Sequence, residues 1–253
     1  YSEDPCLVSA LAPELVKGVQ TYGVAANVKH FAANNQETNR VGINETISKR
    51  ALEEIYFPGF KACVTEGGAK TVMSAYNRIN GIACTENKWL LTEKLRSEWG
   101  FDGVVLSDWG AVYHPAKALA AGNDLAMPGP LPWEPIADAV KEGRLDESEL
   151  NLAVERLLTL ISWVQDNFAH EKVKKQDVHT LWSASDEAAY LAACEGMVLV
   201  ENAGILPLSE KAKVSLEGSG AYKLMECGSG SAGITTSRTS SICDGLNVVQ
   251  SGE

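Results

Sequence analysis

An aspartate and a tryptophan stand next to each other at positions 108 and 109, directly after the short apolar run 103–107. A carboxylate at the exposed end of a buried strand is placed to act as a nucleophile. An indole beside it offers a flat apolar surface on which a sugar ring packs its C–H face, while polar groups around it bind the hydroxyls. The pair therefore indicates covalent chemistry on a carbohydrate. The alternative is that Asp108 only caps the helix or turn that follows.

Two further polar pairs stand at the ends of other apolar segments, Lys29 with His30 and Tyr76 with Asn77. Each has an ordinary explanation of its own. Lys29 could pair with a surface carboxylate, His30 could be an interior histidine with its hydrogen bonds satisfied, and Tyr-Asn often begins a turn. An active site, however, requires independent polar groups that converge on one face. Three polar strand ends together favour such a site.

The elements that must position these residues alternate between short apolar strands and helices. We predict strands at 24–30, 71–75, 103–107 and 124–127, and helices at 48–66, 89–99 and 115–121. Continuous apolar strands that alternate with helices predict a parallel sheet covered on both faces, and we find no antiparallel signal. The pattern suits a (β/α)8 barrel or a doubly wound sheet, and in both the chemistry lies at the carboxyl ends of the strands.

The second part of the chain has a different composition. An amphipathic helix is predicted over 146–168, and the charged stretch after it reads as a linker. Beyond the linker we predict a helix at 185–194 and strands at 197–200 and 206–208, followed by a Gly- and Ser-rich region. The predicted organisation is a first domain over 1–168, a linker over 169–181 and the beginning of a second domain over 182–253.

Six segments, three of them long motifs, resemble those of one family in the order that family has them. The segments 28–40, 72–81 and 99–110, with 1–5, 195–202 and 206–208, resemble glycoside hydrolase family 3 of the β-glucosidase type. The resemblance implies an α/β fold in which the later half of a (β/α)8 TIM-like barrel is followed by the start of an α/β sandwich. With four strands where a closed barrel has eight, about half the barrel would be absent.

The resemblance also implies an activity and a role for each candidate residue. The expected activity is hydrolysis of terminal non-reducing β-D-glucosyl residues with retained configuration, through a covalent intermediate. Asp108 resembles the nucleophile, Lys29 and His30 resemble the pair that holds sugar hydroxyls, Tyr76 resembles the aromatic group near the reacting ring, and Trp109 resembles a wall of the glycone subsite. A β-xylosidase-type substrate, and a non-catalytic carbohydrate-binding protein or inactive fragment of this fold, remain alternatives.

Retaining hydrolysis needs a second carboxyl group as general acid/base, about 5–5.5 Å from the nucleophile. In β-glucosidases of this kind it is a Glu of the later sandwich domain, so we expect it outside this chain. Glu253 stands in a superficially similar context but follows 206–208 too soon to match. The Asp and Arg with which the family grips the sugar from the first half of the barrel have no match here either.

The charge balance excludes several classes of partner. The 253 residues include 33 acidic and 22 basic side chains, for a net charge of −11. Such a chain, without a Lys/Arg cluster, is a poor binder of nucleic acid or anionic membranes, because that binding is driven by cations. A small-molecule β-glycoside or oligosaccharide is the expected partner. Open strand edges would also recruit a complementary half or a second copy, which makes a homo-oligomer an open expectation.

Neither a cofactor nor a metal ion is expected. The six cysteines lie far apart without metal-ligand spacing and are interpreted as reduced thiols. The motif G-x-G-x-x-G at 228–233 lacks a clear preceding strand and a helical opening, which argues against dinucleotide binding. No apolar run approaches the ~20 residues that span a bilayer. Because the N-terminal residues also lack a secretory pattern, a cytoplasmic location is expected.

Overall fold

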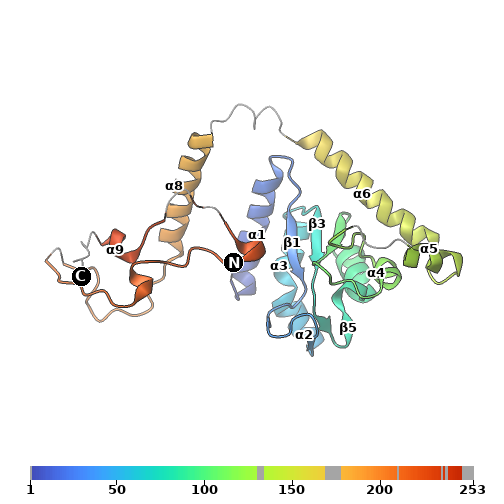
Figure 1. Cartoon of the computed structure of the whole chain (residues 1–253), viewed down its shortest axis with the longest axis horizontal. Coiled ribbons are helices and arrows are strands. Elements are labelled where there is room, and N and C mark those ends of the chain that lie inside the picture. Colours follow the sequence, from blue (N-terminus) through green and yellow to red (C-terminus); the bar gives the residue numbers. More distant parts are fainter. Residues whose placement is uncertain are drawn as a thin grey trace. The chain divides into compact units, whose positions relative to one another are not determined.

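The computed structural model of the chain describes residues 2–129, 134–168, 178–209, 211–234, 236 and 239–246. The chain divides into two compact units, Tyr1–Asp177 and Val178–Glu253 (Figure 1). Each unit is described by itself below. Within the described ranges, no helix combines the length and the apolar character needed to cross a membrane.

The first unit is built on a parallel three-stranded sheet in the order β1-β3-β6. Its strands are β1 (Asn27–Phe31), β3 (Thr71–Ser74) and β6 (Val104–Ser107). Val72 and Val105 pair across β3 and β6, and both are buried. The prediction of a parallel sheet of apolar strands is therefore confirmed for these three strands.

The predicted fourth strand, 124–127, is wrong in extent. It is reduced to a single parallel bridge between Leu106 and Leu125. The physical reason lies in the next hydrogen bond, because the Met127 amide donates to the Ser107 hydroxyl at 2.9 Å instead of extending the ladder.

A second, smaller sheet lies in segments for which the sequence predicts no strand. It consists of β2 (Asn44–Glu45), β4 (Arg78–Ile79) and β5 (Ile82–Ala83). The strands β4 and β5 are antiparallel, so the expectation of no antiparallel pairing is wrong. The hairpin turns at Asn80 and Gly81, whose φ angles are +50° and +91°. Asn-Gly is the preferred pair for a two-residue turn with positive φ at both positions, and this signal is present in the sequence.

Helices pack on the parallel sheet β1-β3-β6. The helix predicted at 115–121 is confirmed with these bounds, and those predicted at 89–99 and 48–66 are confirmed with changes. The helix predicted at 48–66 is interrupted at Pro58, where a π-helix gives way to an α-helix. The helical segments in chain order are α1 (Pro5–Gln20), α2 (Lys49–Ala51), η1 (Leu52–Tyr56), α3 (Pro58–Thr65), η2 (Cys84–Glu86), η3 (Trp89–Glu98), α4 (Pro115–Ala121), α5 (Glu134–Lys141) and α6 (Glu147–Asn167).

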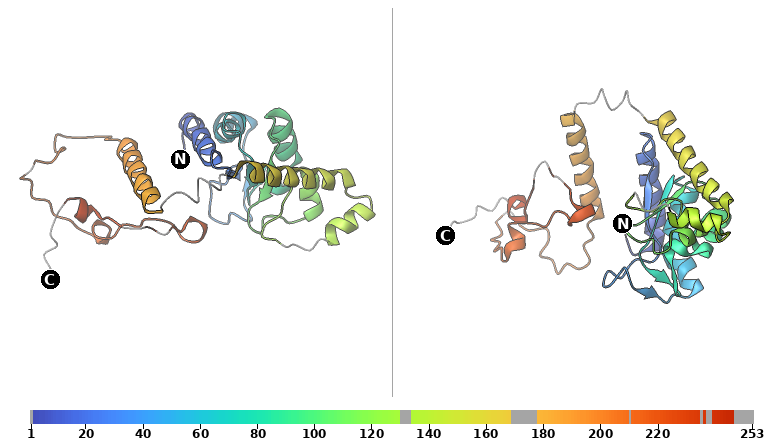
Figure 2. Two further views of the ribbon diagram at one scale, coloured as in Figure 1. Left: turned by 90° about the horizontal axis from the view of Figure 1, so that it is seen from above. Right: turned by 45° about the vertical axis from the view of Figure 1, so that its right-hand side comes forward.

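Helix α1 is absent from the sequence-based prediction, although its start carries a recognisable signal. The Asp4 carboxylate accepts a hydrogen bond from the Cys6 amide at 2.8 Å, and Pro5 occupies the first helical turn. The helix packs closely on α3, because a Cβ atom on Gly59 would lie 2.5 Å from a methyl group of Val8. Figures 1 and 2 show the two helices side by side, α1 in dark blue and α3 in lighter blue.

An aromatic cluster anchors the end of β1 against the helices. The ring centroid of Phe31 lies 5.7 Å from that of Trp99 and 5.9 Å from that of Phe57. Phe31 and Phe57 are almost completely buried. Because Phe31 follows His30 directly, this packing fixes the backbone that carries one of the candidate site residues.

Gly103, just before β6, gives the first testable prediction. A Cβ atom at this position would lie 2.2 Å from the Lys70 carbonyl oxygen, which accepts the Val104 amide. We expect Gly103→Ala to force β3 and β6 apart and to lower the free energy of unfolding by about 1–3 kcal/mol in urea titrations. The matched control is Gly18→Ala in α1, where a Cβ atom meets nothing within 4 Å. An unchanged urea midpoint for Gly103→Ala would contradict the prediction.

The second unit contains helices and irregular backbone in its described residues. The helices are α8 (Val178–Gly196), η4 (Ser219–Ala221), η5 (Gly230–Ala232) and α9 (Ile242–Gly245). The helix predicted at 185–194 is confirmed inside α8. The strands predicted at 197–200 and 206–208 are wrong, since neither segment forms a strand. Residues 197–200 are 61–91% exposed, so no strand or helix among the described residues buries this apolar run.

The predicted linker over 169–181 overlaps the start of this unit. Residues 169–177 lie outside the described part of the chain, and the helix α8 already begins at Val178.

Candidate active site

The carboxyl ends of three adjacent strands bring three of the predicted residues together. His30 lies in β1, Tyr76 follows β3 and Asp108 follows β6 directly. The His30 Nε2 atom lies 3.3 Å from the Asp108 Oδ2 atom. The Tyr76 hydroxyl donates a hydrogen bond to the Trp109 carbonyl oxygen at 2.7 Å. In a parallel sheet neighbouring strands end at the same edge, which is why residues distant in sequence meet here.

The Asp108 carboxylate is held by the backbone on one side and faces His30 on the other. The backbone amide of Asp108 donates to the Ser74 carbonyl oxygen of the neighbouring strand β3 at 3.0 Å. Its Oδ1 atom accepts the Trp109 amide at 2.7 Å. The alternative interpretation of Asp108 as a turn cap thus describes one oxygen, whereas the other is directed at His30. The residue is largely buried, and its side chain is 13% exposed.

Burial controls the protonation of His30. Loss of solvent lowers the pKa of His30 below 6.5, and this effect outweighs the opposing charge of Asp108. The positive charges of Lys29 and Arg40 lower the pKa further. The ring therefore favours the neutral form at pH 7, in which it can form hydrogen bonds but carries no positive charge. At the same edge, burial first and the Asp108 charge second raise the pKa of Tyr76, so its hydroxyl stays protonated.

Lys29 and Trp109 lie beside this group but are less enclosed. Lys29 is exposed on β1, close enough for its charge to influence His30. The Trp109 residue is 63% exposed, while its carbonyl oxygen holds Tyr76. The binding roles of these two side chains stay predictions. Within the described parts of the chain, no group of three or more His, Cys, Asp or Glu side chains could hold a metal ion.

Sequence reasoning missed two residues at this edge. The Arg40 guanidinium carbon lies 4.8 Å from the centroid of the Tyr76 ring, a cation–π distance. Arg40 ends the motif 28–40, so the sequence did carry a signal for it. The Tyr113 hydroxyl donates to the Val41 carbonyl oxygen at 2.6 Å. Nothing in the sequence marks Tyr113, because its contact depends on the path of a loop 72 residues earlier.

Comparison with known proteins decides the family. The glycosyl hydrolase family 3 N terminal domain matches residues 1–160, which is more than half of the chain. The chain belongs to glycosyl hydrolase family 3.

Relatives within family 3 are similar along almost the whole chain. A thermostable beta-glucosidase B of Acetivibrio thermocellus is 44% identical over 96% of this chain and 32% of that protein. An exo-alpha-(1->6)-L-arabinopyranosidase of Bifidobacterium longum is 39% identical over 97% of this chain and 33% of that protein. Among solved structures, this chain is similar to that of beta-glucosidase 3B from Thermotoga neapolitana in complex with alpha-D-glucose, with a TM-score of 0.86 and 41% sequence identity. The match covers 98% of this chain and 35% of the Thermotoga chain.

The family 3 resemblance found in the motifs is thus confirmed, and so is an α/β fold similar to that of solved family 3 structures. The chain spans about a third of the length of the relatives it matches.

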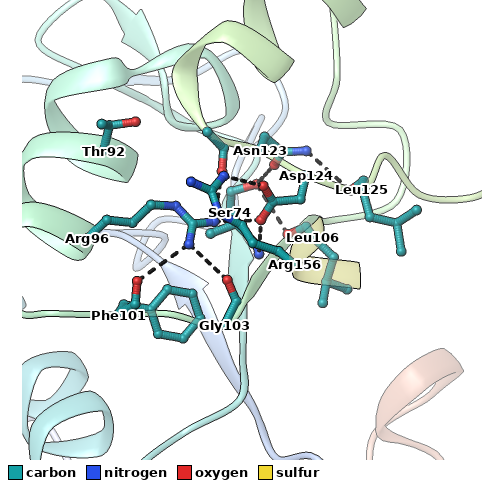
Figure 3. A network of polar contacts seen from close by, with 12 residues as sticks. Ser74, Thr92, Arg96, Phe101, Gly103, Leu106, Asn123, Asp124, Leu125 and Arg156 are labelled. Atoms are coloured by element: carbon teal, nitrogen blue, oxygen red, sulfur yellow. Dashed lines mark hydrogen bonds and ion pairs between the residues drawn. The ribbon is translucent and has the colours of Figure 1, made fainter. Parts of the chain in front are cut away.

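A buried polar network surrounds β6 in this family 3 chain (Figure 3). The Ser74 hydroxyl donates to the Asn123 side-chain oxygen at 2.7 Å. The Asp124 carboxylate accepts the Val105 amide of β6 at 2.8 Å and forms ion pairs with Arg96 and Arg156. Burial lowers the pKa of Arg96 to about 10, so the guanidinium is still charged at neutral pH. The network joins β6 to η3 and α6, and thereby supports the strand that ends in Asp108.

Proposed function

We propose that the chain is part of a retaining, exo-acting β-glucosidase in which Asp108 is the nucleophile. The observation that carries the proposal is the Asp108 carboxylate at the carboxyl end of β6, with one oxygen 3.3 Å from His30 and the other held by the Trp109 amide. Membership of family 3 and the similarity to proteins named beta-glucosidase support it.

In the proposed reaction, an Asp108 oxygen forms a bond to C1 of the terminal glucosyl residue while the bond from C1 to the glycosidic oxygen breaks. A proton from a general acid goes to the leaving oxygen, and water later hydrolyses the glycosyl ester with retention. Lys29 and His30 bind sugar hydroxyls, and these bonds strengthen as positive charge develops on the ring. Trp109 supports the apolar face of the sugar, and Tyr76 lies beside the reacting centre.

The general acid/base is expected to be a Glu from a part of the protein outside this chain. Glu253, the superficially similar residue, lies outside the described residues. The first unit is proposed to be the later half of a (β/α)8 barrel and the second unit the start of an α/β sandwich. The parallel sheet β1-β3-β6 with helices between successive strands supports the barrel assignment.

The sugar itself has one alternative with a specific observation behind it. A relative at 39% identity is named an exo-alpha-(1->6)-L-arabinopyranosidase. A β-glucoside and an α-L-arabinopyranoside can share the orientation of the anomeric bond and of most ring hydroxyls, so the same nucleophile would serve both. Initial rates with the p-nitrophenyl derivatives of the two sugars, and of β-xylose, rank these substrates directly.

The decisive experiment is covalent trapping in the full-length gene product. A 2-fluoro-β-glucoside slows hydrolysis of the glycosyl ester and lets the intermediate accumulate. We expect the intact mass to increase by one fluoroglucosyl group and peptide mapping to place it on Asp108. Absence of an adduct in an enzyme that hydrolyses p-nitrophenyl β-glucoside, or an adduct on another residue, would refute the assignment. An enzyme with neither activity nor adduct would favour the non-catalytic alternative.

A further inference from the structure

Residues 34–42, the middle of the loop between β1 and β2, carry Arg40 beside the candidate site. The loop is anchored at its two ends, where the Asn77 side chain donates to the Ala32 carbonyl oxygen and the Arg78 amide donates to the Ile43 carbonyl oxygen. Most of its hydrogen bonds are internal, such as those from the Gly42 and Ile43 amides to the Asn39 carbonyl oxygen. The Arg40 side chain forms an ion pair with Glu37 of the same loop at 2.9 Å. Something outside the loop must hold it if Arg40 is to stay over the Tyr76 ring.

Tyr113 supplies that connection from the loop after β6. Its hydroxyl lies 2.6 Å from the Val41 carbonyl oxygen and 3.3 Å from the Tyr76 carbonyl oxygen. Across the described part of the chain, the bond to Val41 is the one hydrogen bond that joins residues 34–42 to any other segment. Val41 is the residue directly after Arg40, so the bond acts on the backbone that aims the guanidinium.

The Tyr113 ring is itself fixed in place. The Arg78 guanidinium carbon lies 5.4 Å from the centroid of the Tyr113 ring. Burial raises the pKa of Tyr113, so the hydroxyl keeps its proton and remains a donor to Val41. One phenol therefore ties together the segments that follow β1, β3 and β6, which are the three strands whose ends form the site.

We propose that Tyr113 is a positioning residue of the sugar site, which holds the Arg40 loop against Tyr76 through its hydrogen bond to Val41. The inference rests on the proposed function as a glycosidase. Because the loop lies beside the nucleophile rather than on it, its position affects binding of the sugar in the ground state and the transition state alike. Loss of the bond therefore raises KM and leaves kcat nearly unchanged.

The test is Tyr113→Phe in the full-length gene product, which removes one oxygen atom and keeps the ring over which Arg78 lies. Hydrogen–deuterium exchange of the peptide covering 34–42 measures the loop, and kinetics with p-nitrophenyl β-glucoside measure the site. We expect faster exchange confined to this peptide and a kcat within twofold of the wild type. The KM should increase about three- to tenfold, because one hydrogen bond contributes about that much to binding. Tyr22→Phe, which removes the hydroxyl of an exposed tyrosine after α1, is the matched control.

Unchanged exchange at 34–42 would overturn the proposal. Faster exchange with an unchanged KM would also overturn it, because it would show that the position of the loop does not affect sugar binding. A fall in kcat with constant KM would also contradict it. If the wild type hydrolyses none of the test glycosides, the proposed function fails, and the exchange measurement alone still decides whether Tyr113 holds the loop.

Discussion

Asp108→Asn is expected to lower kcat for β-glucoside hydrolysis by on the order of 10⁴-fold in the full-length gene product, which is typical for loss of a nucleophile. The amide has the shape of the carboxylate and can still accept the Trp109 amide through its oxygen, as Oδ1 does now at 2.7 Å. It cannot form a stable glycosyl ester with C1. Sugar binding through the other side chains should therefore persist while turnover is lost.

Steady-state kinetics measure the turnover of Asp108→Asn, and calorimetric titration with glucose measures its sugar binding. The matched control is Asp166→Asn, an exposed aspartate near the end of α6, which should leave both unchanged. The variant Asp108→Asn should also fail to form the fluoroglucosyl adduct. Turnover within tenfold of the wild type would show that another group attacks C1. Loss of both binding and fold, seen in circular dichroism, would indicate a structural role for this carboxylate.

The strands β3 and β6 of the parallel sheet could be predicted because each is a short, largely apolar run. Val104 and Val105 of β6 belong to such a run, and both are buried. The segment 197–200 has the same composition, yet it forms no strand and is exposed. A strand is stabilised by neighbours that pair with it and cover its faces. Local composition therefore predicts a strand only where the described structure supplies those neighbours.

In the candidate site, too, some residues could be placed from local sequence patterns, whereas others depend on contacts with residues far away in the sequence. Asp108 and His30 could be brought to the same edge from the sequence, because all strands of a parallel sheet end at one edge. Strands β1 and β6, which carry these residues, are separated by β3. The position of Arg40 depends on the path of its loop after β1, and that path is fixed by a hydroxyl from Tyr113. The hairpin at Asn80 and Gly81 was predictable from its turn pair, but its pairing with β2 was not.

The Asp124 network explains how a strand with a polar, solvent-facing end keeps its position. The Asp124 side chain is 1% exposed and the Arg96 side chain 8% exposed, so both charges have lost their water. Arg96 Nη1 also donates to the Gly103 carbonyl oxygen at 2.8 Å, which ties the start of β6 to η3. Such a buried group of charges contributes little net stability when intact, but it is costly to break, because the remaining charges cannot be resolvated.

Asp124→Asn should therefore lower the free energy of unfolding by about 3–5 kcal/mol, since it leaves Arg96 and Arg156 without their common anion. Urea titration of the chain followed by circular dichroism measures the loss. Asp138→Asn, at an exposed pair with Lys141 of α5, is the control and should change stability by less than about 0.5 kcal/mol. Replacing the buried charges together, as Asp124→Leu with Arg96→Met, should recover part of the loss, because no unpaired Arg96 charge remains. Equal stability of the wild type and Asp124→Asn would mean that the network is solvated and does not support β6.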